Sequence, residues 1–356
     1  MKIAVVSTYP QFGSQNIGDS LITETSINLL NELLHRPKIS RVFHSTPWVE
    51  ARPIIEDADH VLIACLAIRQ HGMGIKTYTF MSDLIASGKP YTVIAAGTRV
   101  PVYARNMRLP QQDGSLVEWL RKLSDNSNGF STRGKLTQWF CDHYKIRNKF
   151  CGDIAFYNPR FSERTFIADR TVKRIVISSP HYWRACFGAL KHLIYEVSTL
   201  FPDAKITIAV HGKSSLNNYL KDFGVDVRNI FEDGVSGLDV YDEADLHVGF
   251  RVHGHVSALS RRKYSYLIEQ DGRGADYGIT IPANISVDDH VSEFDVLKAQ
   301  LFGWRKKDVT SSAVTRIISK IRRDMTSGFE GFTGLERTIE GYNSDNRAFL
   351  ASSLNV

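Results

Sequence analysis

The chain has 356 residues, of which 43% are hydrophobic and 23% charged, a balance that excludes a disordered or collagen-like protein. Its four cysteines form no CxxC pair, which argues against a zinc ribbon, a thioredoxin motif and a disulfide-stapled secreted domain. Lys and Arg number 44 against 38 Asp and Glu, a formal charge of +6. This mild excess favours anionic ligands, and we expect no nucleic-acid partner.

The sequence contains no apolar run of the roughly 18 residues that a membrane-spanning helix needs. The first residues, Met1 to Ser7, turn polar after a short apolar run, which predicts a strand and not a signal peptide. We therefore expect a cytoplasmic protein, with peripheral contact to a membrane surface left open. The sequence does not set the oligomeric state.

Short apolar runs alternate with segments of helical periodicity in the first half of the chain. The expected strands are 2–8, 41–45, 60–66 and 91–96, and the expected helices are 20–34, 115–123 and 135–144. Alternation of this kind predicts a parallel sheet with helices on both faces.

The second half repeats the alternation after a break near residues 158–172. Its expected strands are 174–178, 206–210, 225–230, 246–250 and 265–268, and its expected helices are 187–200 and 255–260. At about 150 residues per domain, the length also predicts two domains. We expect one Rossmann-like domain over 1–160, a second over 161–300, and a C-terminal helix and polar tail over 301–356. Residues 327–356 are expected to have little structure.

Positive charge gathers in three loops that directly follow expected strands of the second half. The loops span 178–184, 211–215 and 251–255; seven of their 17 residues are Lys, Arg or His, and none is Asp or Glu. The seven are His181, Arg184, His211, Lys213, Arg251, His253 and His255. With 44 Lys and Arg and 12 His in the chain, about three would be expected. Because ligands of open parallel sheets bind beyond the carboxyl ends of the strands, these loops predict a site for a small, multiply charged anion.

The third loop carries the most specific pattern, Arg251-Val252-His253-Gly254. Arg251 offers a permanently charged fork for a carboxylate or phosphate, and His253 can donate a proton near neutral pH. Gly254 permits close backbone approach where the next helix begins. Three other interpretations stay open: a histidine that caps a helix or packs in the core, an arginine paired with the acids at 242, 243 and 245, and a metal-binding His-x-His pair at 253 and 255.

The segment 245–256, which contains this loop, resembles the C-terminal signature of the polysaccharide pyruvyl transferase family, in which a buried strand runs into Arg-x-His-Gly and a helix of small residues. Two further segments resemble that family in the same order. Asn16-Ile17-Gly18-Asp19 is similar to its N-x-G-D motif, and 131–156, with Arg133, is similar to its strand, arginine, helix and G-D-x-A-F stretch. The resemblance covers about residues 1–290.

The resemblance implies an α/β, GT-B-like fold of two Rossmann-like domains whose parallel sheets face each other across a cleft. It implies transfer of pyruvate from phosphoenolpyruvate onto two hydroxyls of a sugar, giving a cyclic ketal in a polysaccharide such as an exopolysaccharide, or in a glycan precursor. Phosphoenolpyruvate would be a co-substrate, and we expect no other cofactor and no metal. Whether the sugar acceptor is lipid-linked is left open.

On this basis, we expect Arg251 and Arg133 to hold the two anionic groups of the donor, and His253 to protonate its methylene carbon. The expected donor site also includes Lys213, Arg184, His181, Gly254 and His255. Asn16, Gly18 and Asp19 are expected on the acceptor side, with capping of the following helix as the alternative role of Asp19.

Two other functions stay open. A GT-B glycosyltransferase with a nucleotide-sugar donor would place a pyrophosphate over the same loops and an acid for the ribose after a late strand, where Glu269 and Asp271 stand. A non-catalytic relative is the second, and the presence of both Arg251 and His253 argues against it. The chain also departs from many family members after its last strand, where Asp271-Gly272-Arg273-Gly274 replaces a Gly-Lys ending.

Overall fold

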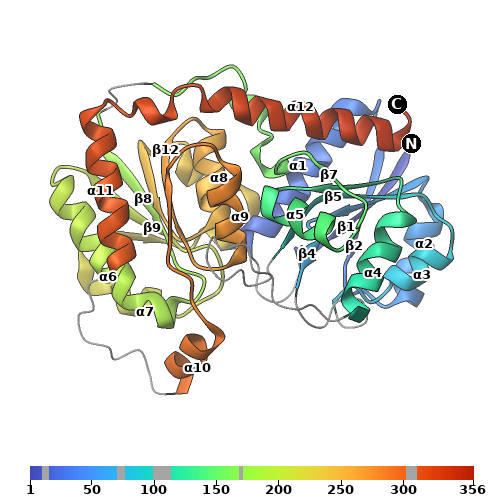
Figure 1. The fold of residues 1–356 in the computed structure, drawn as a ribbon, viewed down its shortest axis with the longest axis horizontal. Coiled ribbons are helices and arrows are strands. Elements are labelled where there is room, and N and C mark those ends of the chain that lie inside the picture. Colours follow the sequence, from blue (N-terminus) through green and yellow to red (C-terminus); the bar gives the residue numbers. More distant parts are fainter. Residues whose placement is uncertain (10–15, 70–76, 99–113, 168–170, 302–310) are drawn as a thin grey trace. The chain divides into compact units, whose positions relative to one another are not determined.

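The computed structural model describes residues 1–9, 16–69, 77–98, 114–167, 171–301 and 311–356 (Figure 1). Contacts divide the chain into two compact units. The first contains Met1–Gly13, Asp19–Tyr157 and Ile339–Val356, and the second contains Ser14–Gly18 and Asn158–Thr338.

The first unit is built on a parallel sheet with the strand order β2-β1-β3-β5-β6-β7, and β4 pairs with β5. In β1 the residues from Ile3 to Val6 are all buried, as expected for a strand that is covered on both faces. The strands are β1 (Lys2–Ser7), β2 (Lys38–Phe43), β3 (His60–Ala64), β4 (Ala67–Ile68), β5 (Tyr91–Thr98), β6 (Gly129–Thr132) and β7 (Lys149–Phe150).

Helices connect these strands, so the predicted alternation is confirmed. They are α1 (Ile17–Leu33), α2 (Trp48–Asp57), α3 (Met81–Ala86), α4 (Gly114–Asp125), α5 (Lys135–His143) and the short 3-10 helix η1 (Ile154–Phe156). Helix α1 begins three residues before the predicted start at 20. Asp19 therefore lies inside its first turn, and the alternative interpretation of Asp19 as the cap of this helix is wrong.

The C-terminal segment corrects the expectation of little structure over 327–356. Helix α12 (Leu335–Leu354) occupies most of it, and from Ile339 onward the chain belongs to the first unit. The Asn346 amide donates to the carbonyl oxygens of Cys151, Gly152 and Tyr342, at 2.9, 3.3 and 2.9 Å. The prediction was wrong because polar residues such as Asn346 are buried and hydrogen-bonded in this helix, so a polar composition did not mean an exposed or irregular segment.

The second unit is built on a six-stranded parallel sheet with the order β10-β9-β8-β11-β12-β13. Each predicted strand of this half is present. The strands are β8 (Arg174–Ser178), β9 (Lys205–Ala209), β10 (Asp226–Arg228), β11 (Leu246–Gly249), β12 (Tyr264–Glu269) and β13 (Ser286–Asp288).

Helices cover both faces of this sheet, with α6 and α11 on one side and α8 and α9 on the other (Figure 1). Helix α8 begins three residues before the predicted start at 255, so His253 is helical. The helices are α6 (Trp183–Leu200), α7 (Asn217–Leu220), α8 (Val252–Ser260), α9 (Gly272–Thr280), α10 (Glu293–Leu301) and α11 (Ser312–Thr326). The 3-10 helices are η2 (Pro159–Phe161), η3 (Lys221–Phe223), η4 (Ile230–Tyr241) and η5 (Glu330–Phe332).

The order of the second sheet contains a topological switch point. From β8 the chain proceeds outward through β9 to β10, and it then crosses back to place β11 against the other side of β8. Loops that leave two such strands in opposite directions open a crevice at the carboxyl edge of the sheet. The loops after β8 and β11 are two of the three cationic loops of the sequence.

Within the described residues, no helix has the length and apolar character needed to cross a membrane.

Candidate functional site

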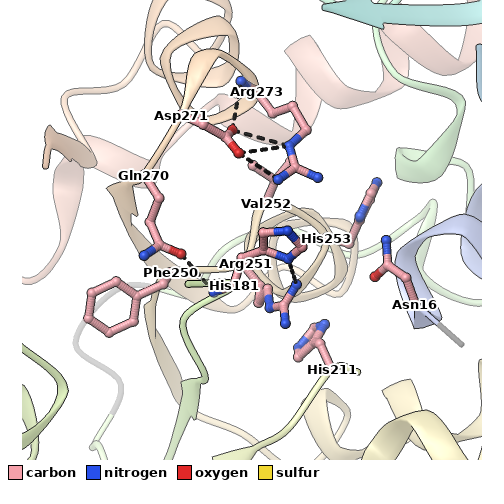
Figure 2. Close-up of a pocket in the computed structure, with 11 residues that line it drawn as sticks. Asn16, His181, His211, Phe250, Arg251, Val252, His253, Gln270, Asp271 and Arg273 are labelled. Atoms are coloured by element: carbon pink, nitrogen blue, oxygen red, sulfur yellow. Dashed lines mark hydrogen bonds and ion pairs between the residues drawn. The ribbon is translucent and has the colours of Figure 1, made fainter. Parts of the chain in front are cut away.

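A pocket of about 440 Å³ lies at this switch point, within the second unit (Figure 2). It is lined by Asn16, His181, His211, Phe250, Arg251, Val252, His253, Gln270, Asp271, Arg273 and Gly274. The loops after β8, β9, β11 and β12 and the first turns of α8 and α9 supply all of these residues except Asn16, which precedes α1. The three cationic loops of the sequence therefore meet in one place.

Arg251 lies between β11 and α8, and contacts of its backbone N, its Nε and its Nη1 fix its orientation. Its backbone N–H donates to Ser178 Oγ at 3.1 Å, and its Nε donates to the carbonyl oxygen of Ser179 at 3.1 Å. Its Nη1 lies 2.9 Å from Nδ1 of His181. Because a guanidinium only donates, Nδ1 of His181 is the acceptor and the proton of the neutral ring is on Nε2.

His181 is in turn held by a residue of the loop that follows β12. Its backbone N–H donates to Oε1 of Gln270 at 2.8 Å, and the Gln270 amide also lies 2.7 Å from the thiol sulfur of Cys186 on α6. Gln270 directly follows β12, so one buried amide connects the loops after β8 and β12. Sequence reasoning missed Gln270, although its place after a strand was a signal that could have identified it.

His253 is the second residue of α8 and lies at the pocket wall beside the start of α1. A Cβ atom on Gly18 would overlap the imidazole ring of His253, because Nδ1, Cγ and Cε1 of that ring occupy the position. Asn16 lines the same pocket, and its Oδ1 accepts a hydrogen bond from the Gly18 N–H at 3.3 Å. Gly18 thus contacts the predicted acid of the donor site.

Asp271 and Arg273 form a side-on ion pair at the start of α9. Arg273 Nη2 lies 2.5 Å from Asp271 Oδ2, and Arg273 Nε lies 3.1 Å from both carboxylate oxygens. Burial raises the pKa of Asp271, but the charge and hydrogen bonds of Arg273 outweigh burial and hold this pKa well below its usual range. Asp271 is therefore ionised, and Arg251 and Arg273 leave the pocket with a net positive charge.

Three further histidines are buried and neutral: His211 lines the pocket, and His247 and His255 lie outside its lining. Burial lowers the pKa of His255 to about 3, and it lowers the pKa values of His211 and His247 well below the usual range. Ser265 Oγ lies 2.7 Å from Nδ1 of His247 and 2.7 Å from Nδ1 of His255. His247 Nε2 lies 2.9 Å from Ser178 Oγ, the atom that accepts from the Arg251 N–H. This buried chain supports the turn that carries Arg251.

Five of the residues expected at the donor site do not line this pocket. His255 faces the core, as described above, and Lys213 is exposed. Arg184 is exposed too, and its guanidinium carbon lies 4.6 Å from the centre of the Trp183 ring. Arg133 is buried in the first unit, where its Nη1 lies 4.0 Å from Oδ2 of Asp153 and its side chain covers Gly97.

Gly254 is buried and does not line the pocket either. A Cβ atom there would meet Tyr241 Oη at 2.6 Å and Ser178 Cβ at 3.1 Å. Asp19, from the expected acceptor set, lies in the first unit with its Oδ1 3.6 Å from the Cys65 sulfur.

Two of the three upstream acids, Asp242 and Asp245, have partners other than Arg251. Asp245 Oδ2 accepts from the backbone N–H groups of Lys173 and Arg174 at 3.0 and 2.9 Å. Asp242 pairs with Arg160 and with Arg261. The histidines of the His253-x-His255 segment also diverge, since one lines the pocket and the other binds Ser265 in the core.

Two parallel α/β units, one of them with a cationic pocket at its switch point, define a GT-B-like protein of the class expected from the sequence. A solved structure of HepE from Anabaena, in complex with UDP-glucose, has a TM-score of 0.51 at 10% identity over 100% of both chains. A Listeria monocytogenes protein provisionally named UDP-N-acetylglucosamine 2-epimerase has a TM-score of 0.50 at 10% identity, over 93% of this chain and 96% of that chain. At these identities the similarity shows the fold alone.

The family model of the polysaccharide pyruvyl transferases matches residues 16–272. The chain belongs to this family, which confirms the resemblance seen in the sequence, and it is therefore a transferase. The matched range includes Asn16, Arg251 and His253 of the pocket. No curated protein sequence matches the chain.

Proposed function

We propose that this transferase moves pyruvate from phosphoenolpyruvate onto two hydroxyls of a sugar, forming a cyclic ketal in a polysaccharide or glycan precursor. The observation that carries the proposal is the presence of Arg251 and His253 in one pocket of net positive charge. Phosphoenolpyruvate is a small molecule with a carboxylate and a phosphate, so it needs fixed cations and one proton donor. The pocket offers both kinds of group.

In the proposed reaction, Arg251 holds one anionic group of the donor, and His253 gives its proton to the methylene carbon, which becomes a methyl group. Positive charge then develops on the neighbouring carbon, and a sugar hydroxyl attacks it. The bond from this carbon to the phosphate oxygen breaks, and the phosphate leaves with the proton of that first hydroxyl. A second hydroxyl closes the ring, and its proton restores His253.

The other histidines in and near the pocket are suited to roles other than protonation of the methylene carbon. His181 accepts from Arg251 at Nδ1, so its Nε2–H is a donor suited to an anionic oxygen. His211 and His255 are buried groups of lowered pKa, so neither is a proton source near neutral pH. His253, which lines the pocket, is the histidine that we assign as the acid. A positioned acid contributes about 10²–10⁴-fold in rate.

Replacing His253 tests this assignment. We expect His253→Gln to reduce phosphate release from phosphoenolpyruvate in the presence of sugar acceptor by about 10²-fold or more, while calorimetry still detects donor binding. Retention of the parental rate in a folded His253→Gln protein would remove His253 from the acid role.

The acceptor would be recognised near Asn16, which lines the pocket beside His253. Asp19 remains the proposed partner of an acceptor hydroxyl, on the first unit. Asn16→Ala and Asp19→Asn are expected to raise the KM for the sugar more than the KM for phosphoenolpyruvate. The opposite pattern would place these residues with the donor.

A nucleotide-sugar glycosyltransferase is the alternative, and two side chains argue against it. Glu269 is 1% exposed and accepts a hydrogen bond from Ser286 Oγ at 2.6 Å, and Asp271 holds Arg273. Both acids that could bind a ribose are thus engaged within the protein. Thermal unfolding with phosphoenolpyruvate or with UDP-sugars separates the two functions, since only the true donor is expected to raise the Tm.

A further inference from the structure

We propose that Arg273 is the second anion-binding residue of the pocket, and that Asp271 fixes its guanidinium so that Arg251 and Arg273 bind different anionic groups of one ligand. The identity of that ligand as phosphoenolpyruvate rests on the proposed function. The anion-binding role of Arg273 can be tested without it.

The need for a second cation follows from the ligand. A guanidinium binds one carboxylate or one phosphate through two parallel N–H bonds, so a donor with both groups requires two such forks. The sequence suggested Arg133, with Lys213 or Arg184, as partners of Arg251. None of these three lines the pocket, whereas Arg273 does.

Asp271 holds Arg273 along the edge formed by Nε and Nη2. The carboxylate receives Nε and Nη2, so Nη1 lies at the opposite end of the planar group. Arg273 lines the same pocket as Arg251, and in the view of Figure 2 the ring of His181 lies between their two guanidinium groups. A guanidinium that is pinned along one edge loses little rotamer freedom when a ligand binds, because its direction is already set.

Capping of α9 does not explain the pair. Asp271 Oδ1 accepts from the backbone N–H of Arg273 at 3.0 Å, and this cap needs no charged side chain at position 273. The side chains of Asp271 and Arg273 are 14% and 21% exposed. The same Asp-x-Arg spacing occurs at Asp226 and Arg228, where the side chains are 34% and 44% exposed and lie outside this pocket.

Calorimetric titration of the whole chain tests the proposal with three probes: phosphoenolpyruvate, inorganic phosphate and pyruvate. Arg273→Gln removes the fork, and Arg273→Lys keeps the charge but loses the side-on geometry. Arg228→Gln is the matched control, because it breaks an ion pair of the same spacing in the same unit. Circular dichroism and thermal unfolding establish that each variant is folded.

We expect Arg273→Gln to weaken phosphoenolpyruvate binding by about 10-fold to 100-fold, the range for a charged hydrogen-bonded pair. We also expect it to weaken either phosphate or pyruvate by a similar factor and to leave the other within about twofold. Arg273→Lys is expected to lose at least about fivefold in phosphoenolpyruvate affinity, and Arg228→Gln to match the parent.

The outcomes separate the two proposals. If the parent binds phosphoenolpyruvate and Arg273→Gln binds it equally well, the role of Arg273 is wrong and the donor assignment stands. If the parent binds phosphate but not phosphoenolpyruvate, and Arg273→Gln loses phosphate, the role of Arg273 stands and the donor is wrong. If the parent binds none of the three probes, the pocket is not an anion site and both proposals fail.

Discussion

The imidazole ring of His253 occupies the place where any side chain at position 18 would begin. Gly18 is helical and has an ordinary backbone conformation, so the requirement for glycine here is one of space. Gly18 and His253, which belong to the same unit, therefore contact each other at the proposed acid.

We expect Gly18→Ala to displace the ring of His253 and to lower kcat by about 10²-fold, because a catalytic group moved by an ångström loses about that much. Donor affinity is expected to stay within about threefold of the parent. Steady-state phosphate release and calorimetry measure the two quantities. Gly341→Ala is the control, because no atom lies within 4 Å of a Cβ at this helical glycine. Unchanged kcat in Gly18→Ala would mean that His253 acts from more than one position.

A second prediction concerns Gly254, which was expected to bind the donor. An added Cβ would press on Tyr241 Oη and Ser178 Cβ, both on buried elements. We expect Gly254→Ala to lower the free energy of unfolding by about 1–3 kcal/mol, the usual cost of overpacking. Urea unfolding measures the change. If Gly254→Ala kept the parental free energy of unfolding but lost affinity for the donor, Gly254 would be a donor-binding residue and not a packing residue.

The three buried, neutral histidines at and near the pocket predict a dependence of stability on pH. The folded-state pKa values of His211, His247 and His255 all lie below the value of about 6.5 for an unfolded chain. Below that pH the unfolded chain binds protons that the folded chain does not. The contribution of these groups is therefore fully present above about pH 6.5, and it is lost as the pH falls toward their folded pKa values.

Each such histidine adds a slope of up to about 1.4 kcal/mol per pH unit below pH 6.5. We expect His255→Gln to reduce the slope of the free energy of unfolding between pH 6 and 5 by about that amount. The exposed His35 serves as the control, and His35→Gln is expected to leave the slope unchanged. A slope that His255→Gln does not alter would indicate that His255 is protonated in the folded protein.

The last prediction concerns α12. Asn346 is fully buried, and its amide donates to three carbonyl groups. Asn346→Ala leaves those groups without this donor, and we expect a loss of about 1–3 kcal/mol in the free energy of unfolding. Chemical denaturation measures it, with the exposed Ser352→Ala on the same helix as the control. Equal stability of the two variants would show that Asn346 is not needed to hold α12.

Most strands of both sheets and the meeting of three cationic loops could be predicted from the sequence, because continuous apolar runs mark buried strands and parallel strands place their following loops at one edge. The short strands β4, β7 and β13, and β6, were not among the expected strands. The direction of each side chain within a loop could not be predicted. His253 and His255 are two residues apart, yet a helix directs one to the pocket and the other to Ser265. Arg184 lies over Trp183, a contact that no local pattern specifies.

Helix α12 escaped prediction for a different reason. Its buried face includes Asn343, Asn346 and Ser353, so the hydrophobic periodicity that marks an amphipathic helix is weak. Asp271 and Arg273 were visible in the sequence as a departure from the family pattern, but their pairing depends on the start of α9 and required the structure.

The pairing of β8 with β11 has a consequence for the order in which the molecule assembles. Ser178 and Gly249 are register partners although a long stretch of chain, including β9 and β10, separates them. The loops carrying His181 and Arg251 are brought together only when that distant pairing is complete, which is a slow kind of contact to form. A chain that has not yet formed this strand pairing has no binding site. The ligand of this pocket therefore binds only the folded protein, and its binding shifts the folding equilibrium toward the folded state.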